Sequence, residues 1–220
     1  MYKWDFYTVL QSFDLFALGL WTTFLYTVGS ISLGIVIGLL VCFARFSSSA
    51  LLRTLARSYQ EIFRCTPLLV QIMWAYYALP LLTGYSISNT MAGLLTLSFY
   101  VGSFYSEIFR GGINAVDKGQ TEAALATGLS KFQNMRHVVL PQSIKKMLPA
   151  FINQSIIQVK NTSLLYVISV AELTYMTSVV NSETYRPMES YSIAAIMYFI
   201  MIFPLTKIAD RVEKNLSRSD

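Results

Sequence analysis

Four polar residues interrupt an apolar stretch in the C-terminal half of the chain. The stretch runs from about Met147 to Val170, and its polar group is Lys160, Asn161, Thr162 and Ser163. An ionisable side chain within an apolar span is costly, so it usually faces a water-filled cavity or a paired charge. We therefore expect this group to line a pathway for a polar solute. Two alternatives are an amine that extends to the membrane surface and an ion pair with a carboxylate such as Glu107.

Glu107 and Arg110 are spaced i, i+3 within another apolar run, so they share one helix face and can pair with each other. A structural pair near the cytoplasmic end is the interpretation we favour, and Glu107 also belongs to the predicted pathway group. The single histidine, His137, has no cluster of Cys, His or carboxylate residues at ligand spacing around it. The sequence therefore predicts no metal site.

The segment 117–141 differs from its apolar surroundings because it is polar and rich in alanine. Asp117 and Gln120 predict the start of a helix, and Gly128 predicts its left-handed end. Ser130 and Gln133 repeat the capping pattern for a second helix, which Pro141 is expected to bound. The result is a short helical hairpin outside the membrane. Its first helix is expected to carry one orienting charge and three exposed small side chains: Glu122, Ala123, Ala124 and Ala126.

This hairpin has two interpretations from its residues alone. Small alanine side chains would let the helix backbone approach a partner protein closely, so the helix could dock into a groove of that partner. The same helix could equally pack on the other cytoplasmic loops of its own chain. The residues by themselves leave both open.

The elements that must position these residues are membrane helices. Hydrophobic residues make up 54% of the 220 residues and charged residues 13%, and the mean hydropathy is +0.48, a balance that favours lipid over water. We expect one all-α membrane domain, 1–220, because no linker divides the chain. A span needs roughly 20 apolar residues, and five spans are predicted, at about 15–44, 67–82, 91–109, 147–170 and 191–208.

The glycines of the first span, Gly34 and Gly38, form a small-xxx-small pair. Such a pair lets a second helix approach closely. Glycine is also tolerated in membrane helices without any such role, and the sequence leaves the two interpretations equal.

Positive residues indicate the orientation of the spans. Of the 17 Lys and Arg residues, all but Lys3, Lys160 and Arg186 fall on the side of the C-terminus when five spans are assumed. Cytoplasmic loops carry the excess of Lys and Arg in membrane proteins. The N-terminus is therefore predicted outside and the C-terminus inside, which places the hairpin in the cytoplasm. Arg64 and Thr66, before the second span, are expected to meet phosphate headgroups or a partner ATPase, and anchoring at the cytoplasmic surface is sufficient to explain Arg64.

Several function classes are excluded or disfavoured. A phosphate-binding loop ends in Lys followed by Ser or Thr, and no lysine of this chain is followed by either, so any ATP must be hydrolysed by another chain. The net charge is +5, but most positive residues lie beside apolar runs, as in membrane proteins, and this disfavours nucleic-acid binding. Cys42 and Cys65 have no metal or redox spacing. The first residues lack the pattern of a cleaved signal peptide.

The hairpin also carries a recognisable motif. Permeases of ABC transporters share Glu-Ala-Ala, three residues, Gly, nine residues and Ile-x-Leu-Pro; this chain has Glu122-Ala123-Ala124, Gly128 and Val138-Val139-Leu140-Pro141. Four further stretches are similar to one branch of these permeases: "FRCTPLLVQ", "YSEIFRGGI", "KGQTEAA" and "KNTSLLYVIS". The chain resembles, over nearly its whole length, the polar amino acid permeases of bacterial ABC importers, of the glutamate/aspartate and glutamine type.

The resemblance implies a type I ABC importer fold in the bacterial inner membrane and a permease that is not itself an enzyme. The hairpin would be the coupling helix that docks into a separate ATPase, with Glu122, Ala123, Ala124, Gly128, Leu140 and Pro141 as coupling residues. The implied partners are two ATPase subunits carrying ATP and Mg²⁺, a second permease subunit of the same or a similar chain, and an extracytoplasmic amino acid-binding protein.

Substrate choice is inferred from charge. A lysine beside an asparagine favours carboxylate-rich or neutral polar solutes over cations, which indicates glutamate, aspartate or glutamine before arginine and histidine. The alternative function is a passive, anion-selective channel. A membrane-embedded enzyme lacks the necessary side-chain clusters.

Overall fold

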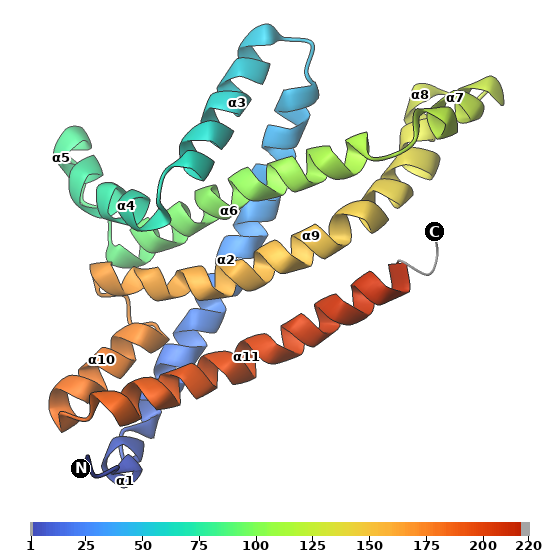
Figure 1. Cartoon of the computed structure of the whole chain (residues 1–220). Helices are drawn as coiled ribbons and strands as arrows, with labels where there is room; N and C mark the ends of the chain where they lie inside the picture. Colours follow the sequence, from blue (N-terminus) through green and yellow to red (C-terminus); the bar gives the residue numbers. More distant parts are fainter. Residues whose placement is uncertain (1, 217–220) are drawn as a thin grey trace.

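The computed structural model describes residues 2–216, which form helices joined by short turns (Figure 1). Arg218, one of the predicted cytoplasmic residues, lies outside the described residues. The α-helices are α1 (Phe6–Leu10), α2 (Phe13–Phe46), α3 (Ala50–Cys65), α4 (Leu68–Met73), α5 (Leu79–Thr83), α6 (Asn89–Asn114), α7 (Lys118–Ala126), α8 (Lys131–Asn134), α9 (Leu140–Asn161), α10 (Leu173–Thr184) and α11 (Pro187–Leu216). Two π-helical turns, η1 (Trp74–Ala78) and η2 (Met135–Val139), and the 3₁₀ helix η3 (Thr162–Ile168) complete them.

Helix α2 crosses the long helices α6 and α9 and makes its most extensive contact with α6 (Figure 1). The glycines of its small-xxx-small pair lie at this crossing. A Cβ atom added to Gly34 would lie 2.4 Å from Val101 Cγ1, and one added to Gly38 would lie 2.8 Å from Tyr105 Cβ. The pair therefore serves the close approach of α2 and α6, which decides between the two interpretations of the sequence.

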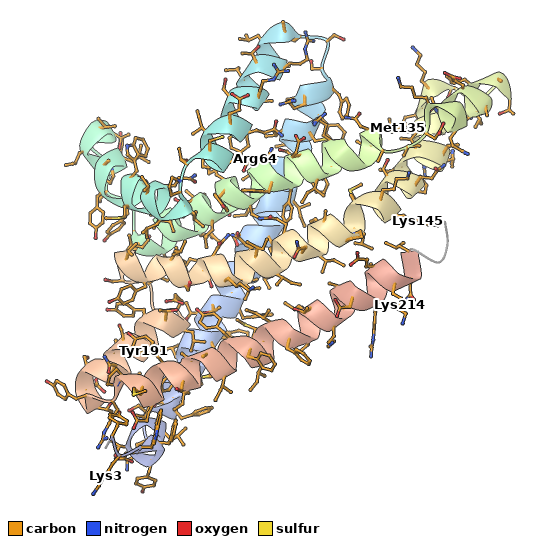
Figure 2. The ribbon with its side chains drawn as sticks, in the orientation of Figure 1. Lys3, Arg64, Met135, Lys145, Tyr191 and Lys214 are labelled. Atoms are coloured by element: carbon orange, nitrogen blue, oxygen red, sulfur yellow. The ribbon has the colours of Figure 1, made fainter. Side chains whose placement is uncertain are left out.

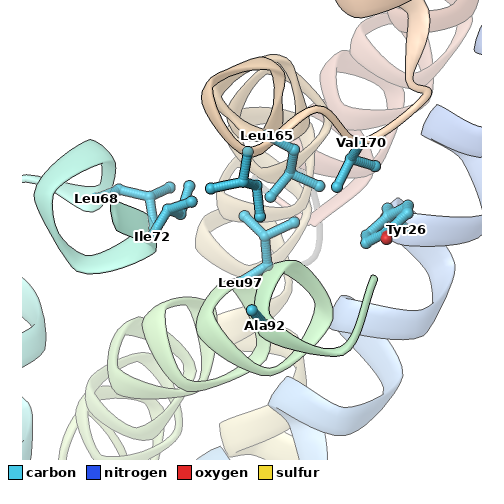
Figure 3. Close-up of a cluster of buried hydrophobic side chains, with 8 residues drawn as sticks. Tyr26, Leu68, Ile72, Ala92, Leu97, Leu165 and Val170 are labelled. Atoms are coloured by element: carbon cyan, nitrogen blue, oxygen red, sulfur yellow. The ribbon is translucent and has the colours of Figure 1, made fainter. Parts of the chain in front are cut away.

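A cluster of buried apolar side chains joins α2, α4, α6, η3 and the turn that follows it (Figure 3). Tyr26 comes from α2, Ile72 from α4, Leu97 from α6 and Leu165 from η3. Ile72, Leu97 and Leu165 are completely buried. Dispersion and close contact in this cluster fix the broken segment around α4 and η3 against the two long helices.

Residues 50–65, which the sequence places in a cytoplasmic loop, form the helix α3, and it is bent by 108° from the segment 68–83 that follows. The break lies at Thr66 and Pro67, because a residue before proline avoids helical angles, and Thr66 has φ −111° and ψ 143°. The Gln71 side chain donates to the carbonyls of Phe63 at 3.0 Å and Thr66 at 3.1 Å, which satisfies the interrupted helix end.

Two described helices, α2 and α11, are long and apolar enough to cross a membrane, and the number rises to four if each bent pair forms one span. The bent pairs are α3 with residues 68–83, and residues 131–168 with α10. Helix α6 has 26 residues and covers the predicted third span. The all-helical class predicted from the sequence agrees with the structure, while the number of five spans stays a prediction.

Candidate coupling site and translocation pathway

The connection between α6 and α9 folds into a helical hairpin of α7 and α8 that projects from one end of the helix bundle (Figure 1). Asp117 caps α7 by accepting the amide of Gly119 at 2.6 Å. At the other end, the Gly128 amide donates to the Leu125 carbonyl at 3.0 Å, and the Leu129 amide donates to the Ala124 carbonyl at 3.3 Å. These two bonds form a Schellman motif.

Gly128 itself has φ +87°, so the predicted left-handed end of α7 is confirmed. The predicted cap of α8 is confirmed as well. Ser130 Oγ accepts the Gln133 amide at 3.3 Å, and Gln133 Oε1 accepts the Ser130 amide at 2.9 Å. The turn between α7 and α8 is therefore specified by local hydrogen bonds, and it needs no partner protein to form.

One surface of the hairpin combines a carboxylate with apolar groups. Glu122 and Ala123 are exposed, and so are Leu125 (41%) and Phe132 (71%). The expectation that Ala124 is exposed was wrong, since it is 8% exposed. Helix α7 packs on α8 and η2, and Ala124 lies on the side of α7 that this contact covers. The open surface thus consists of Glu122, Ala123 and the neighbouring apolar side chains.

Pro141 does not end the second hairpin helix, contrary to the prediction. The helical path runs from α8 through η2 into α9, with Pro141 in the first turn of α9. Proline has no amide to donate and its ring clashes with a carbonyl four residues earlier. The π turn η2 removes the conflict, because the Leu140 amide donates to the carbonyl of Met135, five residues back. The proline therefore loosens the helix without breaking it, and α8 is continuous with α9.

The base of the hairpin is held by direct contact between α6 and α9. Lys146 Nζ donates to the carbonyl of Ala115 at 2.8 Å, which satisfies an orphan group at the end of α6. A Cβ atom added to Gly112 would lie 2.8 Å from Met147 Cβ and 3.0 Å from the carbonyl of Ser143. A force on the hairpin therefore reaches α6 and α9 together.

Leu140 and Pro141 lie at this base and are both exposed. Leu140 lines an apolar groove of about 660 Å³ between α2, α6 and α9. The two residues thus stand where the hairpin joins the apolar body of the chain, and they do not lie on the same surface as Glu122 and Ala123.

Lys160 is exposed and makes no ion pair or hydrogen bond through its amine with any residue of the described range 2–216. It lines a cavity of about 450 Å³ between α9 and α11, to which Asn153, Asp210 and Glu213 also contribute. Glu107, the carboxylate suggested as a partner for Lys160, pairs with Arg110 instead.

The residues after Lys160 differ in what they contact. Thr162 is completely buried and donates to the carbonyl of Val159, while Ser163 donates to that of Lys160, each at 2.7 Å. Ser and Thr hydroxyl groups in helices often donate a hydrogen bond to a carbonyl of the preceding turn in this way. Asn161 Nδ2 donates to Gln158 Oε1 at 3.2 Å, and Gln158 in turn donates to Ser30 Oγ on α2 at 3.1 Å. The structure therefore leaves Lys160 as the member of the group whose side chain has no partner on its own helix, and it links Asn161 to α2 through Gln158.

Glu107 lies in a polar network between α2, α3 and α6. Its carboxylate accepts two hydrogen bonds from the Arg110 guanidinium. Gln60 of α3, which is 3% exposed, donates to Ser106 Oγ at 2.7 Å and to Glu107 Oε2 at 3.5 Å, and accepts from Arg45 of α2. The favoured pairing of Glu107 with Arg110 is confirmed. The role of Gln60 was not found from the sequence, because its partners lie on other helices, 15, 46 and 47 residues away.

Two fully buried carboxylates were also missed. Glu172 caps α10 by accepting the amides of Thr174 at 2.9 Å and Tyr175 at 2.7 Å, and Tyr198 of α11 donates to it at 2.9 Å. Glu189 accepts the Asp5 amide at 2.8 Å. Both carboxylates join elements distant in the sequence, and the one local signal is the position of Glu172 directly before the apolar start of α10.

No group of His, Cys, Asp and Glu residues that could hold a metal ion occurs within residues 2–216. His137 is exposed on η2, where its Nδ1 atom lies 3.1 Å from the Gln133 carbonyl. The arrangement is that of a membrane helix bundle with a projecting helical hairpin and internal polar groups. Such a chain can transmit motion and line a pathway.

Comparison with known proteins defines the class of this chain. Residues 15–219 match the family described as binding-protein-dependent transport system inner membrane component, and the chain belongs to this family. It is a permease subunit of an ABC importer, resident in the membrane. These likenesses do not favour the passive channel that the sequence left as an alternative.

Named relatives come from several bacteria. The chain is 38% identical over 184 residues to the glutamine transport system permease protein GlnP of Escherichia coli K12, covering 83% of this chain and 84% of that protein. It is 36% identical to the putative GlnP of Rickettsia felis over 198 residues, 90% of this chain and 91% of that one. It is 32% identical to the arginine transport system permease protein ArtQ of Bacillus subtilis over 216 residues, 98% and 99% of the two chains.

Two solved structures are similar as well. A crystal structure of an amino acid ABC transporter with histidines superposes with a TM-score of 0.91 at 35% identity, covering 97% of this chain and all of that chain. The inward-facing MetNI methionine ABC transporter superposes with a TM-score of 0.74 at 20% identity, covering 94% and 98%. The second likeness concerns the fold alone.

Proposed function

We propose that this chain is the permease subunit of an ATP-driven importer of polar amino acids, and that the hairpin of residues 117–141 couples it to a separate ATPase. The observation that carries the proposal is the hairpin itself. It closes on its own caps, presents Glu122, Ala123 and exposed apolar side chains, and is joined to both α6 and α9 at its base. A rigid projection of this kind transfers a partner's displacement to the helices it joins.

The proposed assembly contains a second permease subunit of the same or a similar chain, two ATPase subunits that carry ATP and Mg²⁺, and an extracytoplasmic amino acid-binding protein. Each permease crosses the membrane five times with its N-terminus outside and its C-terminus inside. Closure of the ATPases on ATP moves the two hairpins and opens the passage outward, and hydrolysis resets the inward state.

The substrate class follows from charge and from the named relatives. GlnP proteins are named for glutamine and ArtQ for arginine, so their names agree on polar amino acids and differ on charge. Positive side chains within this chain favour carboxylate-rich or neutral polar solutes over solutes with a cationic side chain, which leads us to propose glutamine, glutamate or aspartate before arginine.

The test is uptake into vesicles that hold this permease, its ATPase and its binding protein. Glu122→Lys reverses the carboxylate charge of the open hairpin surface and is expected to abolish ATP-driven uptake of L-glutamine while membrane insertion stays intact. Glu183→Lys, an exposed change on α10 at the other end of the bundle, serves as a charge-matched control. Uptake without ATP, or equal ATP-driven uptake by wild type and Glu122→Lys, would contradict the proposal.

A further inference from the structure

Helix α3 carries a straight polar stripe along one face. Its members are spaced by four, three and four residues, which places them in one line on a helix: Arg53, Arg57, Gln60 and Arg64. The opposite face holds Leu51, Leu55 and Ile62, which are 68%, 59% and 59% exposed. In a membrane the apolar face suits lipid, so the stripe must face protein or water.

Two members of the stripe, Arg53 and Gln60, have hydrogen-bond partners. Arg53 Nη1 donates to the carbonyls of Ser47 at 2.8 Å and Ser48 at 2.7 Å, which ties it to the turn between α2 and α3. Gln60 is buried against Ser106 and Glu107 of α6. The stripe therefore lies along the α3 side that packs on α6, beginning at the turn that the sequence assigns to the cytoplasm.

None of the three arginines of the stripe makes an ion pair within residues 2–216, and Arg64 is the one of them that lies against an aromatic ring. Its guanidinium carbon lies 5.5 Å from the centroid of the Phe104 ring on α6, and no ion pair or hydrogen bond joins that group to another residue in the range 2–216. The nearby carboxylate of Glu107 is occupied by Arg110. Figure 2 labels Arg64 at the end of α3 that approaches α6.

The depth of Arg64 follows from helix geometry. Arg64 is eleven residues beyond Arg53, a distance of about 16 Å along α3 at the rise of an α-helix. The hydrocarbon layer is about 30 Å thick, so an α3 helix that enters it at Arg53 and runs along the membrane normal carries Arg64 to near its middle. An unpaired arginine at that depth is strongly unfavourable against lipid and marks a water-filled cavity or a bound anion.

We propose that Arg64 binds a carboxylate of the transported solute at the middle of the passage. A guanidinium offers two parallel N–H groups that match the two oxygens of a carboxylate. The Phe104 ring attracts the cation and limits its orientations without cancelling its charge. This inference rests on the proposed function, and it adds the residue that recognises the group every amino acid shares.

The experiment measures the binding of amino acids to the purified complex of permease and ATPase. The extracytoplasmic binding protein is left out, so that any preference among the amino acids comes from the membrane complex. The probes are L-glutamine, L-glutamate and L-arginine, each compared with the derivative in which the α-carboxylate is an amide. Wild type is expected to bind the amino acid that it takes up about 10- to 150-fold more tightly than the amide, the range of a hydrogen-bonded charge. Arg64→Met is expected to lose that preference, and Arg64→Lys to keep part of it.

The matched control is Arg57→Met, seven residues closer to the cytoplasm on the same stripe and also exposed; it is expected to keep the full preference. If wild type takes up none of the probes with ATP, the proposed function fails and the inference with it. If uptake is normal but Arg64→Met still prefers the carboxylate, the inference alone is overturned. The same holds if the substitution lowers only insertion or stability, because the anion on Arg64 would then come from lipid or the second permease subunit.

Discussion

Gly128→Ala tests whether the hairpin is held together by its own backbone caps. Gly128 has φ +87°, and a Cβ atom added there would meet no atom within 4 Å. The substitution therefore causes no clash, and its cost is the conformational cost of a left-handed residue with a Cβ atom, about 1–2 kcal/mol. That energy corresponds to about a 5- to 30-fold rise in the open fraction of the hairpin.

Hydrogen exchange is the direct measurement of this opening. The Leu129 amide, which donates to the Ala124 carbonyl, is expected to exchange about 5 to 30 times faster in Gly128→Ala. Gly128→Asn is expected to have a smaller effect, because asparagine tolerates the left-handed conformation. Coupled uptake should fall in the same order as protection is lost.

The matched control is Gly111→Ala. Gly111 also has no atom within 4 Å of an added Cβ, but it lies inside α6 with helical angles. Alanine favours a helix over glycine by about 1 kcal/mol, so exchange of the hairpin should not accelerate. Unchanged exchange in Gly128→Ala, or equal acceleration in both variants, would refute the reasoning that the positive φ at Gly128 holds the hairpin.

Three further predictions concern helix contacts and the helix connections. Gly38→Ala places a Cβ atom 2.8 Å from Tyr105 Cβ and should cost about 1–3 kcal/mol, seen as a lower melting temperature in detergent; an unchanged melting temperature would contradict the close α2–α6 contact. Lys146→Met removes the bond to the α6 carboxyl end and should destabilise the hairpin base by about 1 kcal/mol, measured as faster exchange there, whereas Lys145→Met should not. Pro141→Ala restores an amide and should convert the π turn into α-helix, turning the hairpin relative to α9; cross-links between hairpin and ATPase that keep their wild-type pattern would argue against it.

Local sequence was sufficient for the parts of the molecule that depend on hydrogen bonds between near neighbours. The cap at Ser130 and Gln133 and the left-handed end at Gly128 are formed by residues no more than five positions apart. Such bonds form wherever the chain places those residues in that order, since they need no distant partner.

Tertiary structure decided the features that depend on which helices meet. Ala124 is buried because α7 packs on α8 and η2, and no periodicity in a nine-residue helix shows that contact. Pro141 continues a helix because a π turn absorbs its missing hydrogen bond. A proline in sequence is equally compatible with a helix stop, so this outcome could not be foreseen.

The charged residues show the same division most clearly. The sequence by itself determined that this is an all-helical membrane chain with a projecting hairpin, because composition and local capping act on every short segment independently. Only the tertiary structure decided that Glu107 is engaged by Arg110 and Gln60, that Lys160 faces α11, and that residues 50–65 form a helix with Arg64 at the end far from the turn between α2 and α3. The energy of a charge in a membrane depends on what lies across from it, and that is set by how helices distant in sequence come together.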